Sequence, residues 1–250
     1  EHNEAAPAQH EMAPIFTTSN LAADQNQLTM EIMKKVARRH GLLCLLHEKP
    51  FEGVNGSGKH NNWSIATDKG ENLFSPGKTP MENAQFLLFL TAVIKAVDEN
   101  QDLLRCIVAS AGNDHRLGAN EAPPSIMSIY VGDELDAILN AIRLGTDYED
   151  AKKKKMTIGV DVLPPIPKDS TDRNRTSPFA FTGNRFEFRS VGSNLSISGP
   201  NTILNAILAD ALKSFADELE KSDNFDSDLH KLIKREITNH WKILFNGNGY

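Results

Sequence analysis

The chain has 250 residues, of which 40% are hydrophobic and 24% charged, and its formal net charge is −6. It is long enough to bury the core of one large globular domain or two small ones. The negative charge argues against a nucleic-acid partner, because such proteins carry a basic surface. Since Cys44 and Cys106 are the only cysteines, we expect no disulfide framework, no cysteine-based zinc site and a reducing, cytoplasmic location. No membrane partner is expected either, because the longest apolar run, at 86–94, is far shorter than the roughly 20 residues that span a bilayer.

In the first half of the chain, apolar spacing predicts two helices and two short strands. Residues 20–40 have helical periodicity and end at Gly41, and the apolar run at 42–47 suits a buried strand. A second strand is predicted at 61–67. The Thr-Pro-Met-Glu sequence at 79–82 is a capping box with proline at the first helical position, so it predicts a helix start. The apolar faces of the two helices are assigned to Leu28, Ile32 and Val36 and to Phe86, Leu90, Val93 and Val97.

The second half is predicted to place strands and helices on either side of a surface insertion at 146–172. The lysine run within this insertion is interpreted as a solvated face. Helices on both sides of alternating, strand-like segments indicate the α+β class, with helices packed on an antiparallel or mixed sheet. The predicted elements are a strand at 125–131, a helix at 133–144 ended by Gly145, a strand at 179–190, and helices from Pro200 and from Ser227 to Leu244.

Residues 53–60, Gly-Val-Asn-Gly-Ser-Gly-Lys-His, come close to the phosphate-binding P-loop motif G-x-x-x-x-G-K-[ST]. A P-loop needs a Ser or Thr hydroxyl after the lysine to hold Mg²⁺, and a helix must follow. Here His60 replaces the hydroxyl residue and a strand-like run follows. The glycines suit close approach of a ligand to the backbone. We therefore interpret His60 as a metal ligand, with a structural histidine as the alternative.

Acidic and basic side chains form two further groups. Glu4 and Glu11 flank a proline-containing stretch, and paired carboxylates bind Mg²⁺ or Mn²⁺; the alternative is two exposed glutamates. On a strand, Arg185, Glu187 and Arg189 share one face. Two guanidinium groups beside a carboxylate suit phosphate and a metal, and the alternative is a surface ion-pair ladder. Together these residues favour a metal–nucleotide site built from strands.

The order and spacing of these segments resemble the motifs of the glutamine synthetase family. The likeness extends over residues 2–215 and is greatest to the large bacterial type III members. The segments that carry it are residues 4–11 (E-V-x-P-A-Q-x-E in the family), 53–60 (N-G-[SA]-G-x-H), 116–123 (the flap R-L-x-G-x-E-A-P), 174–177 (N-R-S-[AS]) and 185–189 (R-x-E-x-R).

The resemblance implies a role for each matching residue. Two divalent cations, Mg²⁺ or Mn²⁺, would be bound, the first by Glu4 and Glu11 and the second by His60 and Glu187. L-Glutamate would be bound by Asn55, Gly56, Arg116 and Arg189. The nucleotide would be bound by Ser64, Arg175 and Arg185, with Arg175 also stabilising the transferring phosphoryl group and Glu121 taking a proton from ammonium.

The resemblance also implies a fold and a reaction. The expected fold is the glutamine synthetase/guanido kinase-like catalytic domain, a curved antiparallel sheet packed with helices. Residues 1–250 would be part of that domain, without the family's N-terminal β-grasp domain, first metal-ligand strand and C-terminal extension, and would have little activity alone. The reaction would use ATP to form γ-glutamyl phosphate from L-glutamate, and ammonia would then displace phosphate to give L-glutamine. A homo-oligomer is expected, a dodecamer of two hexameric rings.

Three other functions remain open at this point. A γ-glutamyl-amine ligase would use the same acyl phosphate with a bulkier amine. A P-loop NTPase would keep ATP hydrolysis when His60 is replaced by serine, whereas the ligase would lose metal binding. A catalytically silent regulatory or assembly module is the third alternative.

Overall fold

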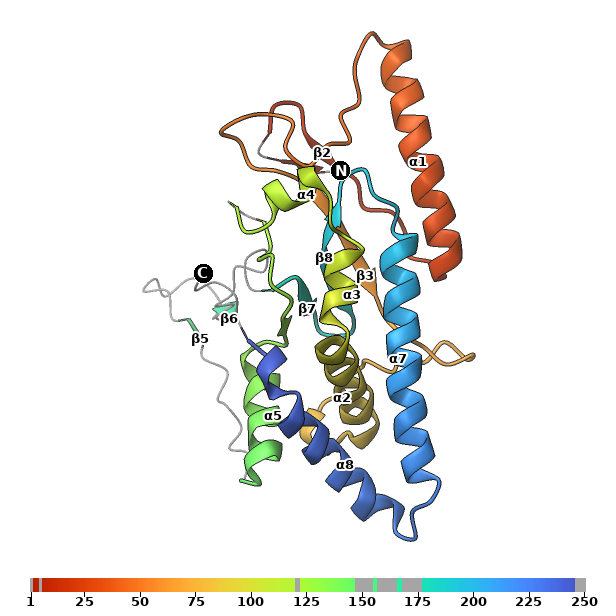
Figure 1. Cartoon of the computed structure of the whole chain (residues 1–250), viewed down its shortest axis with the longest axis vertical. Coiled ribbons are helices and arrows are strands. Elements are labelled where there is room, and N and C mark those ends of the chain that lie inside the picture. Colours follow the sequence, from red (N-terminus) through yellow and green to blue (C-terminus); the bar gives the residue numbers. More distant parts are fainter. Residues whose placement is uncertain are drawn as a thin grey trace.

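The computed structural model describes residues 2–4, 6–119, 122–146, 155–156, 166–167 and 177–245. Long helices run beside a small sheet (Figure 1). Among the described residues, no helix combines the length and apolar character needed to cross a membrane. The strands are β1 (His2–Asn3), β2 (His10–Glu11), β3 (Gly58–Trp63), β4 (Ile129–Tyr130), β5 (Lys155–Met156), β6 (Ile166–Pro167), β7 (Phe179–Phe181) and β8 (Phe186–Gly192). The helices are α1 (Ser19–Arg39), α2 (Ala84–Glu99), α3 (Gln101–Cys106), α4 (Ala111–Arg116), α5 (Asp133–Leu144), α7 (Ser198–Leu219) and α8 (Phe225–Asn239), with short 3₁₀ helices η1 (Pro80–Glu82) and η2 (Trp241–Ile243).

The main sheet has four strands in the order β3-β8-β7-β4. β8 pairs antiparallel with both β3 and β7, whereas β4 pairs parallel with β7. The expectation of helices packed on an antiparallel or mixed sheet is confirmed, and the described sheet is the mixed form. Separate two-stranded pairs are formed by β1 with β2 and by β5 with β6.

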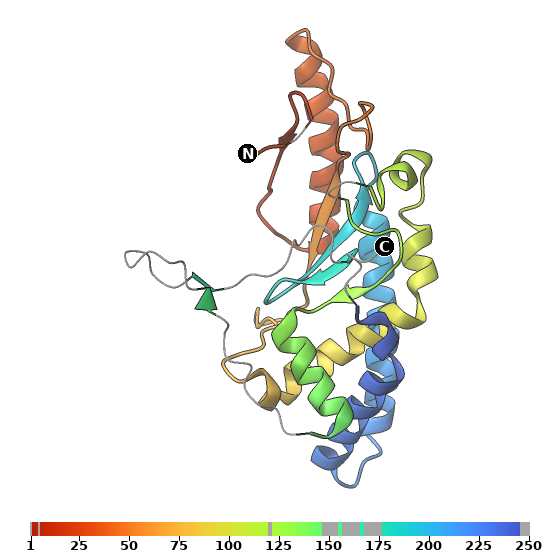
Figure 2. The ribbon, with the colours of Figure 1, turned by 90° about the vertical axis from the view of Figure 1, so that its left-hand side faces the viewer.

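Figure 2 shows helices on one side of this sheet. The hydrophobic core includes a cluster of aromatic side chains from β3, β7 and β8. Phe179 and Phe186 stack with ring centroids 4.7 Å apart, and Phe74 meets Phe186 edge-on at 5.2 Å. Each such pair contributes about 0.5–1.5 kcal/mol beyond the area that it buries. The predicted inner face of α2 is also confirmed, because its four predicted positions are all buried. This packing fixes one face of β3 and β8 and leaves the other face for polar residues.

Two asparagines of α7 attach that helix to β3. Asn61 Nδ2 donates to Asn201 Oδ1 at 2.8 Å, and Trp63 Nε1 donates to Asn205 Oδ1 at 2.9 Å. These bonds give the buried polar atoms of β3 partners, which buried polar groups require. The helix thereby fixes which face of β3 points away from the core.

The predicted strand at 42–47 is wrong. The residues have no strand structure, and Leu42 and Leu43 are 67% and 74% exposed. The predicted helix before them is confirmed as α1, but its stripe of Leu28, Ile32 and Val36 is exposed too. Apolar composition predicts burial only where a partner surface is within reach, and here the described residues cover these side chains only in part.

Three further boundaries differ from the sequence prediction. The single strand expected at 179–190 is a hairpin, because β7 and β8 turn around Gly183, which has a φ of +97°. The strand expected at 125–131 is only the two-residue β4. The last helix ends at Asn239, and its predicted continuation is η2. The helix at 133–144 ends at a left-handed Gly145, as predicted.

The N-terminus of α2 provides a direct test of capping. The sequence prediction places the cap at Thr79, but that side chain makes no capping bond and precedes only η1. Instead, Asn83 Oδ1 accepts a hydrogen bond from the Phe86 backbone N–H at 3.0 Å. Replacing Asn83 by alanine should therefore lower the free energy of unfolding of the chain by about 1 kcal/mol, measured by urea denaturation. Thr79→Ala is the matched control, and an equal loss from it would contradict this assignment.

Candidate functional site

The polar face of β3 and β8 forms the centre of the candidate site. Trp63, Phe186 and Phe188 are buried on the core side, so the alternating residues point the other way. On this second face, His60 Nδ1 lies 2.8 Å from Glu187 Oε1. Two strands that are far apart in sequence thus bring together the two residues that the sequence predicted as ligands of one metal.

Arg189 extends this pair. Its Nε and one terminal nitrogen donate to Glu187 Oε2 at 3.3 and 3.2 Å, and its side chain is 1% exposed. Burial opposes ionisation of Glu187, but the hydrogen bond and charge of His60, with those of Arg189, lower the pKa of Glu187 to about 2. Glu187 is therefore a carboxylate at neutral pH, which is the form that binds a cation.

A β-bulge brings His60 into this position. Lys59 pairs with Val191 and Asn61 with Phe188, so Arg189 and Ser190 together lie opposite His60. One extra residue in β8 shifts the register at this point and kinks the strand. The bulge allows Lys59 and His60, although adjacent, to serve different parts of the site.

The other end of the polar face holds an exposed arginine. Arg185 Nε donates to Asn62 Oδ1 at 3.1 Å, and the strand register places Ser64 next along β3. Both Arg185 and Ser64 are exposed. Two of the three residues predicted to bind the nucleotide thus share one end of the strand pair, with the His60–Glu187 pair further along it.

The glycine loop is fixed against the end of β8. The Ser57 backbone N–H donates to the Glu48 carbonyl at 2.9 Å, and Ser193 Oγ donates to the Ser57 carbonyl at 2.8 Å. Lys59 Nζ donates to the carbonyls of Gly192 at 3.3 Å and Leu195 at 2.7 Å, and also to that of Ser193. Lys59, to which the sequence assigned no role, therefore anchors the turn that follows β8.

Arg116 lies beneath this loop and is 3% exposed. Its terminal nitrogens donate to Asn113 Oδ1 at 3.0 Å and to the Arg189 carbonyl at 3.2 Å. A Cβ at Gly58 would overlap the Arg116 guanidinium, and one at Gly56 would come within 3.1 Å of its Cγ. Both glycines are therefore needed for the loop to approach this arginine closely. The structure brings together Gly56 and Arg116, two residues predicted to bind glutamate.

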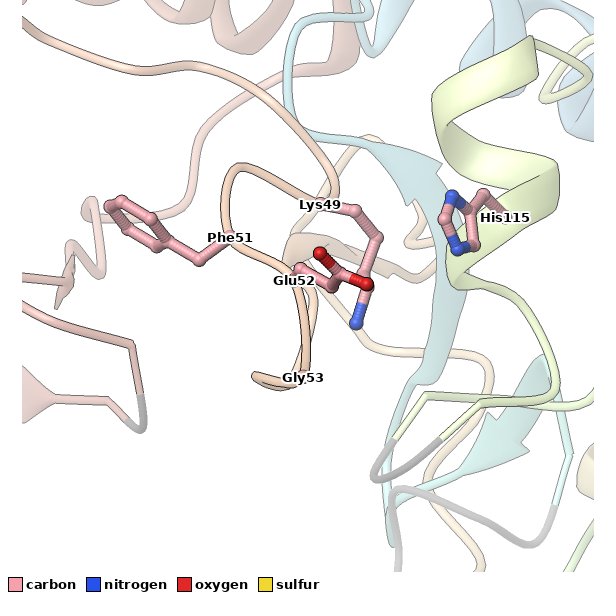
Figure 3. Close-up of a pocket in the computed structure, with 5 residues that line it drawn as sticks. All are labelled: Lys49, Phe51, Glu52, Gly53 and His115. Carbon is pink, nitrogen blue, oxygen red and sulfur yellow. The ribbon is translucent and has the colours of Figure 1, made fainter.

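A cavity of about 380 Å³ lies between the glycine loop and α4. In Figure 3, Lys49 and Glu52 extend into the space between the loop and His115, whereas Phe51 points away. The loop side of this cavity is held by a hydrogen bond from Lys49 Nζ to the Val54 carbonyl. The cavity thus presents basic and acidic groups beside the loop that carries Asn55 and Gly56.

Glu4 and Glu11 lie on the β1–β2 hairpin. The backbone N–H of Glu4 donates to the Gln9 carbonyl at 3.2 Å, which continues the pairing of Asn3 with His10. Because Glu11 is two residues from Gln9, this register puts Glu4 and Glu11 on the same face. A turn in which Ala8 has a φ of +54° connects the two strands that carry these residues.

Some predicted site residues are not brought together or lie outside the described residues. In the described parts of the chain, no three His, Cys, Asp or Glu side chains form a group that could hold a metal. Glu121 and Arg175 lie outside the described residues, as does nearly all of the insertion at 146–172. Sequence reasoning missed Glu48, which is only 2% exposed beneath the glycine loop. The signal in the sequence that could have identified Glu48 is its position as a charged residue directly after the apolar run at 42–47.

Comparisons with known proteins agree on one family. A family model described as glutamine synthetase, catalytic domain, matches residues 1–128. The type-3 glutamine synthetase of Dictyostelium discoideum is 56% identical over the whole chain, which spans 34% of that relative. The glutamine synthetases of Butyrivibrio fibrisolvens and Bacteroides fragilis (strain YCH46) are 55% and 51% identical, again over the whole chain. The chain spans about a third of the length of these relatives.

Two solved structures share the fold. One, titled GmaS/ADP complex-Conformation 1, superposes on 79% of this chain and 37% of its own with a TM-score of 0.52 and 19% identity. The other, titled Apo GmaS without ligand, covers 92% of this chain and 52% of its own with the same TM-score and 16% identity. At these identities the likeness concerns the fold alone.

Proposed function

Because the chain belongs to the glutamine synthetase family, we propose that it forms part of the catalytic domain of an ATP-dependent ligase that joins ammonia to the γ-carboxylate of L-glutamate. The His60–Glu187 pair on the open face of β3 and β8 is the observation that carries this proposal. It supplies a paired histidine and carboxylate at the position where a strand-built phosphoryl-transfer site needs a cation. The proposed location of the parent enzyme is the cytoplasm.

Carboxylate oxygens such as those of Glu187 are the ligands that Mg²⁺ and Mn²⁺ prefer in proteins. His60 Nδ1 and Glu187 Oε1 are 2.8 Å apart, and Glu187 is ionised. A cation held there would neutralise phosphate charge during transfer. Glu4 and Glu11, on one face of their hairpin, are the proposed ligands of the other cation, the first of the two that the family resemblance implies.

The remaining residues would bind and orient the substrates. Arg185 and Ser64 would contact the nucleotide, a role supported by the exposure of both at one end of the strand pair. The cavity between the glycine loop and α4 has the size and the mixed charge to receive an amino acid. Arg116 would offer positive charge from beneath the loop to a substrate carboxylate. Holding both reactants between fixed elements lowers the entropic cost of the reaction.

The test uses a hybrid enzyme, in which this chain replaces the matching segment of the Dictyostelium discoideum relative. We expect the hybrid to form glutamine from glutamate, ammonium and ATP with release of phosphate. The hybrid should also assemble as the parent relative does, and the proposed state is a dodecamer of two hexameric rings, measured by light scattering. Preference for a polyamine over ammonium would instead favour a γ-glutamyl-amine ligase. ATP hydrolysis without ligation would contradict both ligase functions.

A further inference from the structure

Glu48 is a buried carboxylate at the point where four segments of the chain meet. Its backbone carbonyl accepts the Ser57 N–H, and its side chain is in contact with the turn after β8, where Asn194 N–H lies 3.4 Å from Oε1. A Cβ at Gly112 of α4 would come within 2.8 Å of Oε2, and one at Gly192 would overlap Oε1. Two glycines from distant elements thus make room for this one carboxylate.

Two cations lie near this carboxylate, the half-buried Lys59 and the buried Arg116. Lys59 Nζ donates to the carbonyl of Gly192, where an added Cβ would overlap Glu48 Oε1, and Arg116 is on α4 one turn after Gly112. Burial lowers the pKa of Arg116 to about 10, and the negative charge of Glu48 opposes this shift. A buried charge is costly unless an opposite charge compensates it, so Glu48 provides compensating charge for Arg116.

The two cations differ in how firmly other groups hold them. Lys59 has three backbone carbonyls as acceptors. Arg116 has two acceptors, Asn113 Oδ1 and the Arg189 carbonyl, and its buried Nε has no hydrogen-bond partner. Loss of the negative charge would consequently displace Arg116 more than Lys59. The glycine loop would move with Arg116, because Gly56 and Gly58 lie directly against that side chain.

We propose that Glu48 is a positioning residue for the amino-acid substrate, whose buried carboxylate holds Arg116 and the glycine loop in the arrangement that receives the substrate's carboxylate groups. Glu48 does not touch the substrate, since its side chain is enclosed by α4 and the turn after β8. It acts through Arg116 and through the loop. The inference rests on the proposed ligase function and identifies the residue that shapes its amino-acid site.

The experiment compares variants of the hybrid enzyme by steady-state kinetics and by calorimetric titration with L-glutamate. Glu48→Gln keeps the shape of the side chain and removes its charge. We expect the KM for glutamate and the dissociation constant of glutamate to rise about tenfold or more, with the KM for ATP within twofold, because Arg116 loses the negative charge that compensates its own. Glu71→Gln, an exposed glutamate on another loop, is the matched control and should change neither quantity.

A further variant and a stability measurement separate positioning from stability. Gly192→Ala leaves Glu48 in the sequence but pushes its carboxylate out of place, and it should raise the same KM. The melting temperature of each variant is measured beside its kinetics. An unchanged KM in folded Glu48→Gln, or a rise in KM that disappears when the assay temperature is lowered well below the melting temperature, would show a structural role and overturn the inference.

The two proposals can fail separately. A hybrid that binds glutamate without making glutamine, and binds it more weakly after Glu48→Gln, would contradict the proposed function and support the positioning role. A hybrid that neither binds glutamate nor makes glutamine would overturn both.

Discussion

Replacing Glu187 by glutamine in the hybrid enzyme should reduce glutamine formation at least about 100-fold. The carboxylate of Glu187 has a pKa of about 2, so the enzyme loses a full negative charge at the cation site at any working pH. The amide keeps the size of the side chain but neither the charge nor the strong attraction to His60 and Arg189. Initial rates at several Mg²⁺ and Mn²⁺ concentrations measure the effect, which should include a raised metal requirement.

A matched control distinguishes the loss of a metal ligand from general damage to the folded protein. Glu218→Gln removes an exposed carboxylate that pairs with Arg235 at 2.8 Å, and it should leave the rate unchanged. Direct titration with Mn²⁺ provides the second measurement, since Glu187→Gln should weaken cation binding in the absence of turnover. If Glu187→Gln has normal Mn²⁺ affinity and a normal rate, Glu187 is not a ligand of the metal.

His60→Ser distinguishes the ligase from the P-loop interpretation of the glycine loop. The substitution restores the P-loop pattern at residues 53–60, so a P-loop NTPase would keep or gain ATP hydrolysis. We expect the opposite, because the pair with Glu187 is lost and serine supplies no imidazole nitrogen. Phosphate release from ATP, measured with and without glutamate, decides between the two.

Replacing Asp98 by alanine should lower the free energy of unfolding of the chain by about 3–5 kcal/mol. Asp98 Oδ2 lies 2.7 Å from His240 Nδ1, and His240 Nε2 lies 3.3 Å from Glu236 Oε2. All three side chains are at least nine-tenths buried, so they tie the end of α2 to the end of α8 away from water. Removing Asp98 leaves His240 Nδ1 buried without its carboxylate partner.

Urea denaturation followed by circular dichroism measures this loss. Asp217→Ala is the control, because that carboxylate pairs with Lys213 at 2.6 Å in full contact with solvent, and its removal should leave the unfolding midpoint in place. His240→Gln, which keeps hydrogen-bonding capacity, should cost less than Asp98→Ala. An unfolding midpoint for Asp98→Ala equal to that of the control would show that this network adds nothing to stability.

The best predictions from the sequence concern features that depend on a local pattern within one segment of the chain. Phe186 and Phe188 lie in the core as the pattern required, and α5 ends at Gly145. The His60–Glu187 pair was also predicted, although from resemblance and not from spacing. Its proximity depends on the pairing of β3 with β8, which no local pattern contains.

Two kinds of feature were not predicted from the sequence. One is the choice between two possible helix caps, and the other is burial that depends on residues far away in the chain. At α2, Thr79 and Asn83 are both suitable caps, and the proline after Thr79 favoured the wrong one, since the chain there forms only η1. The run at 42–47 has strand composition but no neighbouring strand to pair with among the described residues. Glu48 was missed because its burial arises from Gly112 and Gly192, which are far away in sequence.

The bulge opposite His60 makes the number of residues in β8 as important as their identity. Deleting Ser190 would leave one residue, Arg189, opposite His60, so the pairing would become regular while Phe188 and Val191 still faced the core. His60 and Glu187 would keep their common face, but β8 would lose the kink of the bulge, and the anchoring of the glycine loop to Gly192 and Ser193 would shift with it. A homologue that keeps both ligands but differs in length between Phe188 and Val191 should therefore hold its glycine loop differently.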